Sequence, residues 1–223
     1  MSPDTASSPY TPARATALAE RLAATFGELL MGGPADAADD VAPLTVMPAA
    51  QATAPQQLAA AHPGGLAARK EALALYRRCL AHYRQRMQAG QPEDDVGAAA
   101  AYFVLACVAA LQQIDVSPAQ LALVERQMRR LLGQHPAWRQ ADAAERQALF
   151  EQFAVLGVLV GESQHEARRQ GPAARANVQR AARGYLRQLL GLQPDHLQLG
   201  DHGLVLRLPV QPLADALKDA GAA

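Results

Sequence analysis

The sequence is poor in aromatic residues, cysteine and lysine, and it has no excess of either charge. Phe, Trp and Tyr make up 4% of the 223 residues, and the only lysines are Lys70 and Lys218. The 21 basic and 21 acidic residues give a formal net charge of zero, so we expect no strong overall attraction to nucleic acid or to an anionic membrane. Two cysteines are too few for a disulfide-stabilised scaffold.

A recognisable export signal is also missing from the start of the sequence. The first residues, MSPDTASSPYTP, contain neither the basic stretch nor the apolar stretch that a signal peptide requires. Two interpretations follow: the protein is cytoplasmic, or the sequence is the mature part of an exported protein with a replacement Met. The Ser-, Pro- and Thr-rich start is typical of mature exported chains and favours a periplasmic or secreted location in the second case.

One stretch, Val96–Leu111, carries no charge, and its only hydrogen-bonding side chain is that of Tyr102. A helix that is apolar on every side must be surrounded by other elements. At about 1.5 Å per residue the stretch spans roughly 24 Å, which is less than the ~30 Å hydrocarbon core of a bilayer. We therefore expect the central helix of a bundle and no transmembrane segment.

The remaining apolar spacing predicts an all-α fold with a five-helix core bundle. A second apolar helix, at about 143–161, should pack directly on 96–111, because Gly157 and Gly161 place small residues four apart and allow close backbone approach. Seams of apolar residues at three- and four-residue spacing predict three amphipathic helices that cover this pair, at 66–89, 118–132 and 172–190.

The two ends of the chain differ from this bundle. Apolar residues at helical spacing follow Thr11-Pro12 as far as Leu29, and residues 34–63 are rich in Ala and Pro without a sustained period. We expect an N-terminal helix on a long linker over residues 1–63, appended to a helical bundle domain over 64–223. Near the C-terminus, apolar residues on both sides of Gly200–Gly203 predict a small β-hairpin with a four-residue loop.

Cys79 and Cys107 lie at nearly equal distances before and after a predicted turn at Gly90–Glu93. In an antiparallel helix pair this places them at similar height, within the reach of a disulfide. A bond between them requires an oxidising compartment. The alternative is two buried free thiols that pack as small hydrophobic side chains.

Glu162 and His165 form a Glu-x-x-His pair on one helical face, as in carboxylate-bridged di-iron bundles. Such bundles use two of these pairs, and the sequence has only one, so a polar end to an apolar helix is the alternative interpretation. No nucleophile motif or phosphate-binding loop is present in the sequence. We therefore expect no cofactor and no catalytic residue.

Two helices carry stripes of basic residues despite the zero net charge. Helical spacing groups Arg180, Arg183 and Arg187 on one face and Lys70, Arg77 and Arg84 on another. A solvated helix face is one explanation, and a docking surface for an acidic protein or a phosphate-bearing ligand is the other. Nucleic acid is not an expected partner, because aromatic stacking residues are scarce beside these arginines.

A series of short motifs runs from Tyr76 to Leu206, over a little more than half of the chain. In order they are a Tyr- and Arg-rich helix, Asp94-Asp95-Val96, Tyr102-Phe103, Phe150-Glu151-Gln152, Leu156-Gly157, Tyr185-Leu186 and Gly203-Leu204-Val205. This order resembles an uncharacterised bacterial family of helical proteins, a domain of unknown function that often follows an export signal. The resemblance implies a bacterial source, a helical fold and life outside the cytosol, and it implies no activity.

These observations favour a non-enzymatic bacterial protein that presents a surface to another protein, such as an accessory or neutralising partner of an exported protein. One alternative is a helical-bundle enzyme that binds a metal or small ligand through Glu162 and His165. Another is a membrane-active bundle that opens to expose Val96–Leu111.

Overall fold

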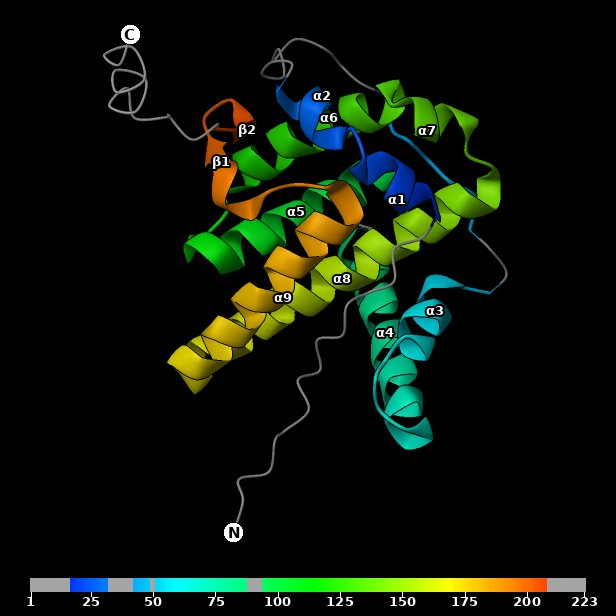
Figure 1. Ribbon diagram of the computed structural model, residues 1–223, viewed down its shortest axis with the longest axis vertical. Helices are drawn as coiled ribbons and strands as arrows, with labels where there is room; N and C mark the ends of the chain where they lie inside the picture. The colour runs from blue at the N-terminus through cyan, green and yellow to red at the C-terminus, as the bar shows by residue number, and fades with distance from the viewer. Residues whose placement is uncertain (1–16, 32–41, 49–50, 88–93, 208–223) are drawn as a thin grey trace, which may run out of the picture.

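A computed structural model describes residues 17–31, 42–48, 51–87 and 94–207, and these ranges form a helical bundle with a small β-hairpin (Figure 1). The expected all-α class is confirmed. The helices are α1 Ala17–Ala23, α2 Phe26–Met31, α3 Ala54–Ala60, α4 Leu66–Met87, α5 Val96–Gln112, α6 Pro118–Gln134, α7 Pro136–Gln140, α8 Ala143–Gln170, α9 Pro172–Leu190 and the 3-10 helix η1 Pro194–His196. The strands are β1 Leu197–Gly200 and β2 Gly203–Leu206.

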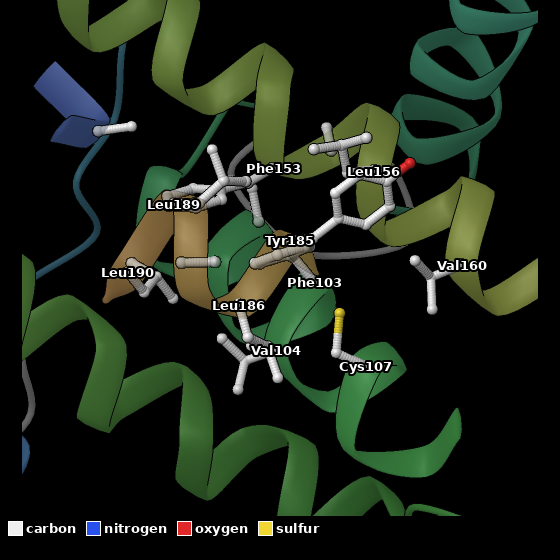
Figure 2. Packing of buried hydrophobic residues seen from close by; sticks show 14 of the residues in the cluster. Phe103, Val104, Cys107, Phe153, Leu156, Val160, Tyr185, Leu186, Leu189 and Leu190 are labelled. Carbon is white, nitrogen blue, oxygen red and sulfur yellow. The ribbon is translucent and has the colours of Figure 1, made fainter. Parts of the chain in front are cut away.

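Helices α5 and α8 pack on each other at the centre, as their apolar sequences predict. Phe103 of α5 stacks on Phe153 of α8 with ring centroids 5.5 Å apart, and both side chains are fully buried. A Cβ added to Gly157 would lie 3.1 Å from Cα of Phe103, so glycine is what lets the two backbones meet. Helices α6 and α9 also pack on α5, and Figure 2 shows Tyr185 and Leu186 of α9 beside Phe103.

Side-chain caps fix where the long helices begin. Asp95 accepts a hydrogen bond from the Gly97 amide at the start of α5. Capping boxes form at α6, where Ser117 pairs with Gln120, and at α8, where Asp142 pairs with Glu145. These caps satisfy amides that the first helical turn leaves without partners, so the local sequence determines the helix starts.

The N-terminal segment differs from the expected appendage. It forms two short helices instead of one, and Leu18, Leu22 and Phe26 are fully buried in the same core as α5 and α8. Helix α1 packs on α7, α8 and α9. The expected start of this helix at Thr11 lies outside the described residues.

The region expected to be a linker contains helix α3, which rests on α4 and α8. Its first amides are capped by a distant carboxylate: Oε2 of Glu151 accepts hydrogen bonds from the Thr53 and Ala54 amides at 2.8 and 2.9 Å. Because this cap comes from α8, the sequence around residue 54 does not reveal it.

The hairpin pairs Leu197 with Leu206 and Gly200 with Gly203. Its loop is the two residues Asp201 and His202, shorter than the expected loop of four, because Gly200 and Gly203 belong to the strands. Gly203 has a φ of 95°, a conformation that favours glycine. Strand β2 packs on α2 and α6, which supports a hairpin that would be marginal alone.

Candidate functional site

A cavity of about 390 Å³ lies between the C-terminal parts of α5 and α8 and residues 114–118, which lead into α6. We call it the α5–α8 cavity. Its volume falls within the range of small-molecule sites, about 300–1,000 Å³. The apolar part of its lining comes from Leu105, Ala106, Ala109, Ile114, Val116 and Leu121.

Gln164 of α8 is a buried polar residue of this lining. Its residue is 5% exposed, and neither Nε2 nor Oε1 has a hydrogen-bond partner within the described part of the chain. Buried side-chain amides nearly always have partners, because each unmet hydrogen bond carries the full penalty of desolvation. Both polar atoms of Gln164 have almost no accessible surface, so they lie behind the lining and do not face the open space.

Tyr102 and Arg86 shape another part of the lining. The Arg86 guanidinium lies 5.9 Å from the centroid of the Tyr102 ring. Burial raises the pKa of the Tyr102 hydroxyl, and the positive charge of Arg86 partly opposes that rise. The missing side chain of Gly161 keeps this part open, since a Cβ there would lie 3.5 Å from the Tyr102 hydroxyl oxygen.

The remaining charged groups of the lining already have partners. Arg168 donates from Nη2 to Oδ1 of Asp115 at 2.8 Å, so these two charges largely cancel. The imidazole Nε2 of His165 lies 3.1 Å from Nη2 of Arg169. The lining combines apolar walls with Tyr102 and the positive charge of Arg86, an arrangement suited to binding.

The two residues of the Glu-x-x-His pair have different neighbours in the structure. The exposed side chain of Glu162 lies 3.8 Å from Nε2 of His82, and His165 is exposed at the cavity beside Arg169. Within residues 17–31, 42–48, 51–87 and 94–207, no three His, Cys, Asp or Glu side chains meet in a way that could hold a metal ion.

Cys79 and Cys107 are both free and buried in the structure. Their helices are not principal neighbours in the bundle, because α4 packs mainly on α3 and α8 while α8 is the principal neighbour of α5. Burial raises the pKa of Cys79 to about 11 and raises that of Cys107 further. Figure 2 shows Cys107 among the core side chains. The predicted turn at Gly90–Glu93 lies largely outside the described residues.

The two basic stripes are only partly available to a partner. Arg84 donates from Nε and Nη2 to the buried carboxylate of Asp94, both at 3.1 Å. Arg183 donates to Asp195 at 3.4 Å. The exposed members of the stripes are Arg180, Arg187, Lys70 and Arg77.

Gln164 and the cavity were not found from the sequence. A signal does exist in the sequence: Gln164 continues a stripe of α8 that includes Val160 and Ala167, and both of those residues are buried. A glutamine on such a stripe is a buried polar group that needs a partner. The sequence argument considered instead Glu162 and His165, which flank it.

The match to a family model decides which group the chain belongs to. Residues 3–207 match the model described as "Family of unknown function (DUF6683)". The chain belongs to this family. The expected membership of an uncharacterised family is thereby confirmed. No curated protein and no solved structure shows a significant match to the chain. None of the helices in the described ranges combines the length and apolar character needed to cross a membrane.

Proposed function

We propose that this protein is a non-enzymatic binding protein and that it holds a small, largely apolar molecule in the α5–α8 cavity. The observation that carries the proposal is the largely apolar lining of the cavity, in which Tyr102 and Arg86 supply polar groups. A binding pocket is typically apolar with a few polar groups that orient its ligand.

The polar groups around the cavity support binding better than catalysis. An acid–base catalyst needs a titratable group within hydrogen-bond reach of the reacting atom. Gln164 does not titrate, and Arg168 is held by Asp115. His165 lies beside the positive charge of Arg169 and is exposed to solvent.

A cavity-filling variant tests the proposal with the fluorophore anilinonaphthalene sulfonate as probe. We expect saturable binding to the wild-type protein and a large loss of it in Ala109→Phe, because the new ring enters the cavity. Ala122→Phe is the control, since Ala122 is an exposed residue of α6. Near-ultraviolet circular dichroism should verify native packing in each variant. Absence of saturable binding to the wild type, or equal binding by Ala109→Phe, would contradict the proposal.

A protein partner is the second candidate, and the exposed arginines of α9 favour it. Arg180 and Arg187 lie on one face of α9, and both are exposed. Exposed charge of one sign steers an oppositely charged partner, so the proposed partner is an acidic protein, for example an exported bacterial protein that this chain assists or neutralises. Binding should weaken with salt and be lost in the double variant Arg180→Glu, Arg187→Glu. A captured protein that binds the double variant equally well would contradict this use of α9.

A further inference from the structure

We propose that the α5–α8 cavity takes a compact amphiphile with one carboxylate on an apolar body, and that Arg86 and Tyr102 hold the carboxylate. This inference rests on the proposed binding function and specifies the chemical class of the ligand. It concerns the part of the lining that α4 and α5 supply together.

The lining residues of α5 form a row with a polar end and an apolar remainder. They occupy positions 102, 105, 106 and 109, which is the spacing of one helix face. At about 1.5 Å per residue the row extends over roughly 10 Å. Tyr102, with Arg86 beside it, stands at the first end, and Ala109 stands at the other. A ligand that lies along the row therefore meets polar groups at one end and apolar walls over the rest.

Arg86 brings to this end a positive charge that the lining does not neutralise. Among the described residues, its guanidinium has the ring of Tyr102 as a neighbour, 5.9 Å from the centroid, and no carboxylate within ion-pair distance. The guanidinium of Arg168 differs, because it already donates to Asp115 at 2.8 Å. A carboxylate beside Arg86 would gain a charge-assisted hydrogen bond.

Tyr102 supplies a second donor at the same end. Its hydroxyl has no hydrogen-bond partner within the described ranges and retains accessible surface, in contrast to the buried amide of Gln164. A Cβ added to Gly161 would lie 3.5 Å from the hydroxyl oxygen, so the hydroxyl borders the space that this glycine leaves in the lining. Burial raises the pKa of Tyr102, so the hydroxyl keeps its proton and can donate. A carboxylate has two accepting oxygens, one for each donor.

Other ligand head groups fit this end less well. An ammonium group would meet the charge of Arg86 and could accept from neither donor, and a hydrocarbon leaves both donors unmet. The nearby carboxylate of Glu162 also raises the pKa of Tyr102, but Arg86 acts on Tyr102 more strongly. Glu162 is not part of the lining and lies 3.8 Å from Nε2 of His82. The charge at this end of the cavity therefore favours an anion.

Three naphthalene probes of similar size test the inference: naphthalene carboxylate, naphthalene carboxamide and naphthylmethylamine, which is an ammonium at neutral pH. The carboxamide keeps the shape and one accepting oxygen of the carboxylate but has no charge. Arg86→Gln removes the charge of the arginine. Arg78→Gln is the matched control, because Arg78 is an exposed residue of α4 outside the lining. Isothermal titration calorimetry measures the affinity of each probe.

At low ionic strength we expect the carboxylate to bind the wild-type protein about fivefold more tightly than the carboxamide, the upper end of what an exposed ion pair contributes. The ammonium should bind most weakly. The carboxylate preference should disappear in Arg86→Gln, persist in Arg78→Gln and decline as salt screens the exposed charge. Tyr102→Phe should weaken carboxylate binding about threefold, through the loss of one hydrogen bond.

The outcomes separate this inference from the proposed function. Equal affinities for the carboxylate and the carboxamide, tightest binding of the ammonium, or a carboxylate preference that survives in Arg86→Gln would overturn the inference and leave the proposed binding function standing. Unchanged carboxylate affinity in Tyr102→Phe would overturn the placement of the anion. Failure of all three probes to bind would overturn both the inference and the proposed function.

Discussion

Arg129 of α6 donates from Nε to Oδ2 of Asp95, the N-cap residue of α5, at 2.6 Å. The Asp95 side chain is fully buried, and that of Arg129 is 11% exposed. The other carboxylate oxygen of Asp95 accepts from the amides of Gly97 and Leu44. One carboxylate therefore caps α5, holds α6 and fixes the segment that precedes α3.

Asp95→Ala should destabilise the protein by about 3–5 kcal/mol, because it removes the helix cap and leaves a nearly buried guanidinium without its main partner. Asp195→Ala is the control. Asp195 pairs with Arg183 in an exposed position, where an ion pair contributes about 0–1 kcal/mol. Urea unfolding followed by circular dichroism measures both. Equal losses in the two variants would show that the Asp95–Arg129 contact does not stabilise the fold.

Gly157→Ala should destabilise the fold by about 1–3 kcal/mol through overpacking. The added Cβ would lie 3.1 Å from Cα of Phe103, and backbone atoms cannot move aside as a flexible side chain can. Gly184→Ala should do the opposite. Apart from the neighbouring backbone of α9 itself, no atom lies within 4 Å of a Cβ built at Gly184, so alanine there should stabilise α9 by about 0.5–1 kcal/mol. Thermal unfolding of the two variants measures whether each substitution raises or lowers the stability. A stabilising effect of Gly157→Ala would refute the close approach of α5 and α8.

Much of the bundle could be predicted because its signals are local. The N-cap at Asp142 and the breaker at Gly171 lie beside the helix ends that they set, and α8 begins at the expected residue, 143. The burial of α5 follows from its own composition, since no polar face exists to meet water. In these places each residue acts on its immediate neighbours.

The features that escaped prediction depend on residues far apart in the sequence. Helix α3 begins at residue 54 because Glu151 caps it. The α5–α8 cavity exists because three separate segments approach without filling the space between them. In the sequence, Gln164 is recognisable as a polar residue on an apolar stripe of α8. A single position of that kind does not distinguish a ligand site from a core amide whose hydrogen bonds are satisfied.

Glu151→Gln should loosen α3 while leaving the rest of the bundle intact. The substitution replaces a charged acceptor with a weaker one, and the amides of Thr53 and Ala54 share that acceptor in the wild type. We expect a loss of about 1–3 kcal/mol and faster hydrogen exchange within α3 than within α9. Glu162→Gln, an exposed change on the same helix, should leave α3 protected. Unchanged exchange in α3 would contradict the cap.

The free energy of unfolding should fall as the pH drops below about 6.5, through His135. Burial lowers the pKa of His135 below 6.5, with a backbone hydrogen bond to Leu22 opposing the shift in part. The unfolded chain therefore takes up a proton on this imidazole more readily than the folded chain does. The contribution of His135 to the free energy of unfolding is complete at pH values above the pKa that His135 has in the unfolded chain. This contribution is lost as the pH falls from that value toward the lower pKa of His135 in the folded protein.

Comparison with His135→Gln isolates this contribution. Burial raises the pKa of Glu125, although Arg129 opposes it, so that group acts with the opposite sign and stabilises the fold as the pH falls. Glu125 is present in both proteins, so the difference between their stability profiles reports on His135. The wild-type profile should be steeper between about pH 7.5 and about pH 5.5. Parallel profiles, or an imidazole that titrates above 6.5, would refute the assignment.

The thiols of Cys79 and Cys107 should be unreactive in the folded protein. A thiolate is the reactive form of cysteine, and burial raises the pKa of Cys79 to about 11 and that of Cys107 further. Cys79 is 6% exposed and Cys107 fully buried, so modification by iodoacetamide should reach Cys79 first and Cys107 only as fast as the protein unfolds. In denaturant without reductant both should react, as the free thiols of the structure require. Recovery of no thiol would establish the bond and, with it, folding in an oxidising compartment.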